Sequence, residues 1–370
     1  MKTRATDTIA AYLFLSPFLL TLLIFFVFAT ARAVYFSFTD YNLFNDPHWV
    51  GLRNYANLFR DDNFLTALRN SVIFAATVTF LQTCGALVMA AVLNQRVRGL
   101  GFFRAAFYMP SVTSSVVITL IFLWMYQRRG VFNYLATQFF TWLPHLLVFL
   151  VLLALVQLVQ VLLERRRGYP AGLLDPALFV ISLLVAVALT AGLAVTGVIE
   201  ARAVPAVDFV WLQTRQEVPA SFPTWLSAPI PLVAIMIQNI FTTIPTFMLM
   251  FLAALQDVPR SYYEAAALDG ATPVQQFFHI TIPSVQPVTF LVVTLGLIGT
   301  LQMFDQVAIF GEAVPLRSVI TLAYFVYDRM FPGAQLPEVG FASAAAIFLA
   351  VFTLLIVMLQ RLVIRSETGR

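Results

Sequence analysis

The chain has 370 residues, of which 60% are hydrophobic and only 11% are charged, and its mean hydropathy is +0.86. A water-soluble core does not need so much apolar surface, so the composition indicates a membrane protein. The net charge is +4. Because the basic residues fall in short clusters between apolar runs, they suit the edges of a membrane better than the binding of nucleic acid.

Three residue types limit the kinds of site that the chain can hold. The single cysteine, Cys84, rules out a disulfide framework and a thiolate metal site. The histidines, His48, His145 and His279, are too scattered for a local metal motif, which leaves only a site assembled from distant segments. Lys2 is the sole lysine, so a phosphate-binding loop cannot exist here. We therefore expect no cofactor on this chain: if ATP provides the energy, another chain binds it.

Eight apolar runs are long enough to cross a bilayer, which takes about 20 helical residues. They lie near residues 10–35, 71–94, 105–126, 145–163, 173–199, 230–254, 286–310 and 341–364. The first run exceeds the 7 to 15 residues of a signal peptide's apolar region, so we expect an uncleaved span. The basic clusters favour a cytoplasmic N-terminus, and eight crossings then place the C-terminus in the cytoplasm as well.

Two of the segments between runs fall outside the cell under this orientation. Residues 36–70 are rich in aromatic residues and predict a folded external loop. Residues 200–229, with prolines at 205, 219 and 223 and tryptophans at 211 and 225, have a composition typical of an interfacial segment.

A small element near residues 255–285 interrupts the apolar sequence on the cytoplasmic side. Asp257 is expected to cap a helix that has Pro259 in its first turn and extends to Leu268. Gly270 then suits the left-handed residue that closes a helix.

A second short helix is expected directly after this glycine. Thr272 supplies a hydroxyl cap, Pro273 suits the first turn, and Gln275 completes a capping box. Pro283 is expected to end this helix before the next span. The element is therefore predicted to be two short helices joined at a glycine corner.

At these positions the chain resembles the membrane-spanning subunits of binding-protein-dependent ABC importers. Their cytoplasmic signature reads Glu-Ala-Ala, three residues, Gly, nine residues, then Ile-x-Leu-Pro. The matching residues here are Glu264, Ala265, Ala266, Gly270, Ile280 and Pro283, and the one departure is Ile282 in place of leucine. The resemblance implies that residues 259–283 form a coupling helix that docks into a cleft of a cytoplasmic ATPase.

Further stretches resemble the carbohydrate-type branch of these importers, which includes maltose, multiple-sugar and glycerol-phosphate systems. They are residues 50–71, 107–126, 297–310, 324–331 and 340–356. The chain departs from the family at residues 311–315, where a Gly-Gly-Pro turn is usual, and at residues 145–199, which add two spans. Because an even insertion preserves sidedness, the signature loop remains cytoplasmic.

The resemblance implies an all-α polytopic membrane protein with the six-helix core of a type I ABC importer permease and two inserted helices. The predicted parts are residues 1–70 (first span and external loop), 71–144 (core helices 2 and 3), 145–199 (inserted pair) and 200–370 (core helices 4 to 6, with the coupling loop at 255–285). It also implies a bacterial or archaeal cytoplasmic membrane. The implied partners are ATP-binding subunits, a second permease subunit, an external solute-binding protein and the lipid bilayer, but no nucleic acid.

Polar side chains inside the spans are candidates for a solute path, because a bilayer penalises polar groups that have no role. Asn239, Thr242, Thr243 and Thr246 form one stripe at helical spacing, and Gln302, Asp305 and Gln306 are expected to share a face of the next span. Neutral amides and hydroxyls suit a sugar or polyol. The alternative for the threonines is bonding to their own helix or packing against neighbouring spans.

The functional expectation is a non-catalytic permease subunit of an ATP-driven sugar importer. The competing hypothesis is an ion-coupled secondary carrier or channel for a small polar solute, for which Asp305 is the one intramembrane carboxylate available. A membrane-embedded enzyme is disfavoured because no cluster of His, Cys or Asp residues is present in the sequence.

Overall fold

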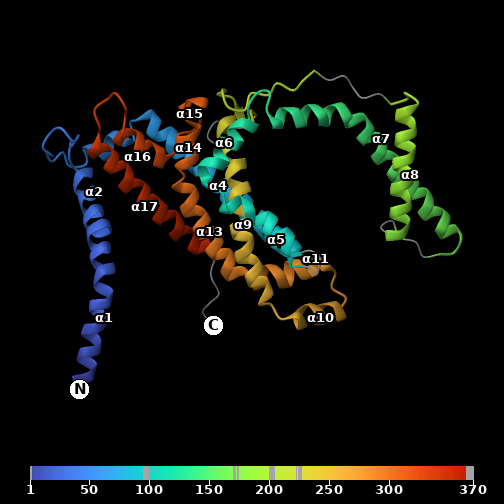
Figure 1. Cartoon of the computed structure of the whole chain (residues 1–370), viewed down its shortest axis with the longest axis horizontal. Coiled ribbons are helices and arrows are strands. Elements are labelled where there is room, and N and C mark those ends of the chain that lie inside the picture. The colour runs from blue at the N-terminus through green and yellow to red at the C-terminus, as the bar shows by residue number, and fades with distance from the viewer. Residues whose placement is uncertain are drawn as a thin grey trace. The chain divides into compact units, whose positions relative to one another are not determined.

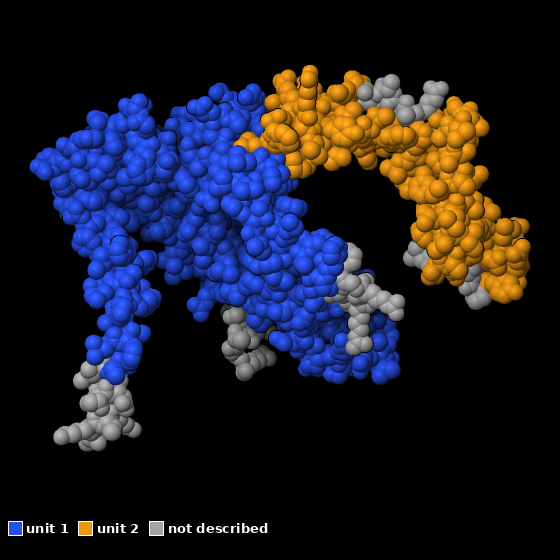
Figure 2. Space-filling model, in the orientation of Figure 1, with its two compact units in different colours: residues 1–122, 212–370 blue, residues 123–211 orange. Residues whose placement is uncertain are grey.

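The computed structural model describes residues 2–94, 100–169, 172, 175–199, 205–221, 223 and 227–363. The chain divides into two compact units, residues 1–122 with 212–370 and residues 123–211 (Figure 2). Within the described residues, seven helices are long and apolar enough to cross a membrane, and a bent helix pair taken as one span makes eight. The predicted all-α polytopic architecture is confirmed. The cytoplasmic location of both termini stays a prediction.

The larger unit contains most of the helices (Figure 1). Its long elements are α1 (Lys2–Thr21), the π-helix η1 (Leu22–Phe28), α2 (Ala29–Ser37), α4 (Asp62–Leu93), α5 (Leu100–Val112), α6 (Ser115–Met125), α9 (Ile230–Gln256), α13 (Gln286–Leu301) and α17 (Val339–Val363). Its short elements are α3 (Arg53–Leu58), β1 (Glu217–Val218), β2 (Ala228–Pro229), α10 (Arg260–Leu268), α11 (Pro273–Gln276), the π-helix η2 (Phe277–Thr281), α12 (Ile282–Ser284), α14 (Asp305–Phe310), the 3₁₀-helix η3 (Gly311–Ala313), α15 (Leu316–Val319) and α16 (Leu322–Met330).

Helix α4 forms the centre of this unit, because it packs along both α9 and α13. One apolar cluster joins the second half of α4 to the second half of α9, around Ala90, Met248 and Phe251. A second cluster lies at the other end, where Phe64 meets the rings of Phe325 and Phe348 edge-on. Inside a bilayer the lipid is as apolar as these side chains, so close van der Waals packing rather than removal from water holds the helices together at both clusters.

The first span stands apart from that centre. Its helices α1 and η1 expose apolar side chains on all sides, and only α2 packs against α17 (Figure 1). A helix that is apolar all round and not covered by its own chain needs lipid or another protein around it.

The third span is bent. Helix α5 ends at Val112, α6 begins at Ser115, and their axes differ by 99°. Pro110 lies in the last turn of α5, where its ring disfavours continuation of a straight helix.

Segment 36–70, which is predicted to be external, is folded as expected. The side-chain amide of Asn54 donates to the carbonyls of Ser37 and Thr39 at 3.0 and 2.8 Å, and Thr39 pairs with Trp49 in a short antiparallel bridge. The expected interfacial segment is described only in part: residues 200–204, 222 and 224–226, which include Trp225, lie outside the described residues.

The smaller unit is a helix pair, α7 (Val131–Arg166) and α8 (Pro176–Val195). Its helices pack through a polar contact in which the Ser182 hydroxyl donates to Gln157 at 2.6 Å. Asn133 at the start of α7 accepts from the Trp211 indole at 3.0 Å and donates to the Phe209 carbonyl at 2.9 Å. Segment 205–211 is thereby tied to the first turn of α7.

Candidate functional site

The first helix of the element at 255–285 begins later than predicted. Its N-cap is Pro259, with extended backbone, and α10 starts at Arg260. Asp257 has right-handed helical backbone and is the C-cap of α9, so the prediction that it caps α10 was wrong. An N-cap side chain reaches the first turn only when its own backbone is extended.

Gly270 forms the corner between the two helices, as predicted. Its φ is +82°, a region that residues with a Cβ rarely adopt. The N–H of Ala271 donates to the carbonyl of Ala266 at 2.9 Å, and the N–H of Gly270 donates to that of Ala267 at 3.1 Å. These two bonds form a Schellman motif, which satisfies the last carbonyls of α10 and fixes the direction of the chain.

The second helix starts with the predicted capping box, since Thr272 and Gln275 bond each other's backbone N–H groups reciprocally. The prediction that Pro283 ends it was wrong, because helical structure continues to Ser284. The preceding residues, Phe277–Thr281, form a π-helical turn. A wider turn places the carbonyls differently from an α-helix, so the missing N–H and the ring of Pro283 are accommodated.

The two helices form one folded element rather than a loose connection. The hydroxyls of Tyr263 and Thr281 lie 3.1 Å apart, and the Gln276 amide donates to the Ala271 carbonyl at 3.3 Å. A pocket of about 320 Å³ lies in the angle between them, and Gly270 and Gln275 are among its lining residues.

The signature residues lie mainly on the surface of this element. Glu264, Ala265, Gly270 and Pro283 are exposed, whereas Ala266 and Ile280 are half-buried. Glu264 makes no ion pair with any described residue. Large apolar side chains beside it are also exposed, including Leu268 at 89% and Val274 at 65%. Exposed apolar residues grouped with a free carboxylate on a rigid element are typical of a protein-binding surface.

The element lies at one end of the larger unit. In Figure 1, α10 and α11 are at the lower end of the unit, toward which α1 also extends, and α15 and α16 are at the upper end. The segments predicted to be cytoplasmic and those predicted to be external therefore group at opposite ends of the unit.

The candidate path residues of α9 are half-buried and bond mainly to their own helix. The Thr242 hydroxyl donates to the carbonyl of Asn239 at 3.0 Å, and Thr243 lies 3.4 Å from the Asn239 side-chain oxygen. Thr246 is exposed. These bonds agree with the alternative weighed for the threonines, and a role of Asn239 and Thr243 in a path stays a prediction.

The second group of candidates does not lie on one continuous helix. Helix α13 ends at Leu301, Gln302 is its C-cap, and α14 begins at Asp305. The expected shared helical face is therefore wrong, because the chain turns between these residues. Gln302 and Asp305 are exposed and Gln306 is half-buried, and their side chains bond no other described residue. Their place at a helix break keeps their polar groups available.

A family model for the inner membrane component of binding-protein-dependent transport systems matches residues 135–368, which include the element around Gly270. This match covers more than half of the chain. The chain belongs to this family.

Similar permeases cover nearly all of the chain. YesP of Bacillus subtilis (strain 168), a probable ABC transporter permease protein, is 27% identical over 357 residues, which make up 95% of this permease and 89% of YesP. The arabinooligosaccharides transport system permease protein AraP of Halalkalibacterium halodurans is 26% identical over 357 residues, 96% of this permease and 87% of AraP.

A solved structure shares the fold. It is a bacterial alginate ABC transporter in complex with an alginate pentasaccharide-bound periplasmic protein. One of its chains matches with a TM-score of 0.66 and 18% identity, covering 100% of this permease and 99% of that chain. The multi-pass membrane architecture of the permease is thus supported by fold as well as by family.

One polar group in the permease was missed from the sequence. Gln82 on α4 is 1% exposed, and its amide bonds no other described residue. It lies against Gly296 of α13, where an added Cβ would come within 2.6 Å of the Gln82 nitrogen. One turn away, the Thr79 and Thr300 hydroxyls lie 3.2 Å apart. The available signal was the spacing of Thr79, Gln82 and Thr83 at i, i+3 and i+4 inside an apolar run.

Proposed function

We propose that this permease is one of two membrane subunits of an ATP-driven importer for a sugar or polyol, located in a bacterial or archaeal cytoplasmic membrane. It would form part of the translocation path and transmit the movement of separate ATP-binding subunits. Family membership is the observation that carries the proposal. The name of AraP, an arabinooligosaccharide permease, supports a saccharide as the solute.

Coupling would take place through α10 and the helix that follows Gly270. The exposed Glu264 carboxylate is suited to a charge-assisted bond with a basic group of an ATPase, worth about 1.5–3 kcal/mol if shielded. Ala265 and Ala266 let another surface approach α10 closely. Because the Schellman corner and the capping box hold the two helices at a fixed angle, the element can move as a rigid lever when ATP-binding subunits close.

The solute would pass among polar groups, for which the amides and hydroxyl of Asn239, Thr243, Gln302 and Gln306 and the carboxylate of Asp305 are the proposed candidates. Amide and hydroxyl groups both donate and accept hydrogen bonds, as sugar hydroxyls do. An external solute-binding protein would deliver the solute, and a second permease subunit would complete the path.

The first experiment purifies the permease with its genomic neighbours and measures uptake of radiolabelled arabinotriose into proteoliposomes. We expect an ATPase and a second permease to copurify, and uptake to require ATP inside the vesicles. Uptake that continues without the ATPase would instead indicate an ion-coupled carrier and overturn the proposal.

The second experiment tests whether the bend at Gly270 is needed to couple solute transport to ATP hydrolysis. Gly270→Leu forces a Cβ into a left-handed backbone at a cost of about 1–2 kcal/mol, so we expect solute-stimulated ATP hydrolysis to fall about tenfold. Gly270→Asn is the matched control, since asparagine tolerates this backbone, and it should keep most of the activity. Equal hydrolysis by the two variants would remove the corner from the mechanism.

A further inference from the structure

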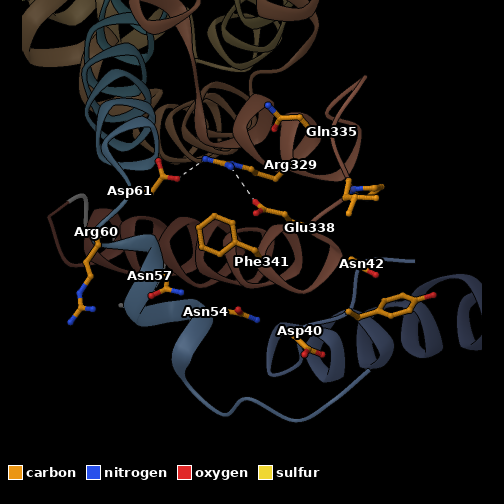
Figure 3. Close-up of a pocket in the computed structure, with 13 residues that line it drawn as sticks. Asp40, Asn42, Asn54, Asn57, Arg60, Asp61, Arg329, Gln335, Glu338 and Phe341 are labelled. Atoms are coloured by element: carbon orange, nitrogen blue, oxygen red, sulfur yellow. Dashed lines mark hydrogen bonds and ion pairs between the residues drawn. The ribbon is translucent and has the colours of Figure 1, made fainter. Parts of the chain in front are cut away.

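A second polar site lies at the end of the larger unit opposite the coupling element. It is a pocket of about 900 Å³, within the size range of small-molecule sites. Three segments line it: the loop after α2, helix α3 with the turn that leads to α4, and the end of α16 with its link to the first turn of α17 (Figure 3). Under the predicted orientation this pocket faces the outside of the cell.

The walls of the pocket are held by side-chain bonds, of which only the one to Glu338 is exposed. Arg329 donates to Asp61 at 2.5 Å and to Glu338 at 3.1 Å, as Figure 3 shows. This guanidinium therefore joins the N-cap of α4 to the residue before α17. On the opposite wall, the buried Asn54 amide is held by two backbone carbonyls. The pocket is thus formed before any ligand arrives, which lowers the entropy cost of binding.

Other polar side chains around the pocket are available. Asn57, Arg60 and Gln335 are exposed, and their side chains bond no other described residue. In Figure 3 Asn57 and Arg60 come from one segment and Gln335 from another; Asn57 is drawn near the ring of Phe341, whereas the Arg60 side chain points away from it. Phe341 and the neighbouring Tyr41 add aromatic surface that can pack against the C–H face of a sugar ring.

The charge of the pocket selects among solutes. Three carboxylates, those of Asp40, Asp61 and Glu338, stand against two guanidinium groups, so the formal charge is −1. Moreover, Arg329 already has two carboxylate partners. An acidic sugar or a phosphate would meet repulsion that one exposed arginine does not offset, whereas the amides and carboxylates suit neutral hydroxyls.

We propose that this pocket is an external saccharide site of the permease, in which a neutral oligosaccharide is held by Asn57, Gln335 and Glu338 before it enters the membrane. The proposal rests on the proposed function as a sugar importer. It assigns to the permease itself a selection step that precedes transport and favours neutral over acidic saccharides.

The experiment measures binding to the full-length permease in nanodiscs without any binding protein. Saturation-transfer NMR is recorded with arabinotriose as the neutral probe and with a galacturonate trisaccharide as the acidic one. We expect arabinotriose to bind and the acidic probe to bind at least tenfold more weakly. The double variant Asn57→Ala with Gln335→Ala should weaken arabinotriose binding about thirtyfold, since the two lost hydrogen bonds contribute about 1 kcal/mol each. Gln213→Ala, an exposed glutamine outside the pocket, should change nothing.

Three outcomes would overturn the proposal: no binding of arabinotriose, stronger binding of the acidic probe, or unchanged binding in the double variant. If the double variant keeps saccharide binding but lowers capture of the purified solute-binding protein, the pocket is a protein-docking surface instead. Arabinotriose uptake by the complete transporter is measured in parallel. Normal uptake without binding to the isolated permease refutes the external site alone, whereas absence of ATP-dependent uptake refutes the proposed function.

Discussion

The two ends of the larger unit are held together in different ways. They are named after the predicted orientation: the outer end contains α3, α15 and α16, and the inner end contains the coupling element at residues 255–285. At the outer end, side chains bond across long sequence separations: Arg69 to Glu217, Asn70 to the carbonyl of Ile320, and Arg329 to Asp61. At the inner end, the coupling element is held mainly by bonds between residues fewer than twenty positions apart, such as Thr272 with Gln275 and Tyr263 with Thr281. Noncovalent bonds therefore tie the outer end to distant parts of the larger unit. The inner end is stabilised mainly by helix caps within the coupling element itself.

This difference suits the two ends to different work. Cross-links between distant segments keep the outer end in one shape, so it can present a preformed surface to solute or to a binding protein. Local caps keep the coupling element rigid while leaving its outer surface free of partners from its own chain. A rigid element with few ties to the body can be displaced as a whole, which a lever requires.

The largest loss of stability is expected when the ion pairs of Arg329 at the outer end are removed. Arg329→Met removes the guanidinium that pairs with Asp61 and Glu338, and the pair with Asp61 is only 24% and 19% exposed. Loss of one partner leaves uncompensated carboxylates, which we expect to cost about 3 kcal/mol. The measurement is the thermal unfolding midpoint in detergent. Arg60→Met, which removes an exposed arginine without an ion pair among the described residues, is the control. An equal midpoint for both variants would contradict the expectation that the ion pairs of Arg329 stabilise the outer end.

The next effect concerns the inner end. Glu264→Arg replaces the proposed contact to a basic group by repulsion, so we expect docking of the ATPase to weaken by about 1.5–3 kcal/mol and solute-stimulated hydrolysis to fall 10- to 100-fold. Because Glu264 has no partner among the described residues, the unfolding midpoint should not change. Glu312→Arg makes the same charge change at the outer end and should leave hydrolysis intact. A lowered midpoint in Glu264→Arg would mean that this residue stabilises its own chain.

A smaller effect is expected at the centre of the outer cross-links. Asn70→Ala removes the amide that donates to the Ile320 carbonyl at 3.1 Å, and this residue is fully buried. An unpaired buried carbonyl costs about 1–3 kcal/mol, so we expect about 2 kcal/mol of destabilisation. The chemical-denaturation midpoint measures it, with Asn57→Ala, an exposed asparagine, as the control. No difference between the two would show that water replaces the lost donor.

The smallest effect is expected from removal of one helix cap in the coupling element, which tests whether this element is stabilised independently of the long helices. Thr272→Ala removes the capping box and should destabilise the helix after Gly270 by about 1 kcal/mol. Hydrogen exchange should rise in residues 273–281 and stay constant in α4 and α9. Exchange that rises along α9 as well would mean that the element is cross-linked to the body, as the outer end is.

The sequence predicted the features that depend on neighbouring residues. Apolar run length located the seven candidate spans and the bent helix pair found among the described residues, because a bilayer fixes how many helical residues must be apolar. The corner at Gly270 and the capping box at Thr272 were predicted because a left-handed residue and a cap are satisfied within a few positions. The spacing from Glu264 to Pro283 similarly indicated the family before any fold was known.

Tertiary structure decided what depends on contacts between distant segments. The chain turns after Gln302, so Asp305 does not continue the same helix, and the apolar pattern carried no sign of this break. The contact of Gln82 with Gly296 and the joining of Asp61 to Arg329 pair residues more than 200 positions apart. Hydropathy and capping patterns each depend on residues within one segment. Pairs between distant residues form only when α4, α13 and the helices of the outer end pack together, so these patterns do not reveal them.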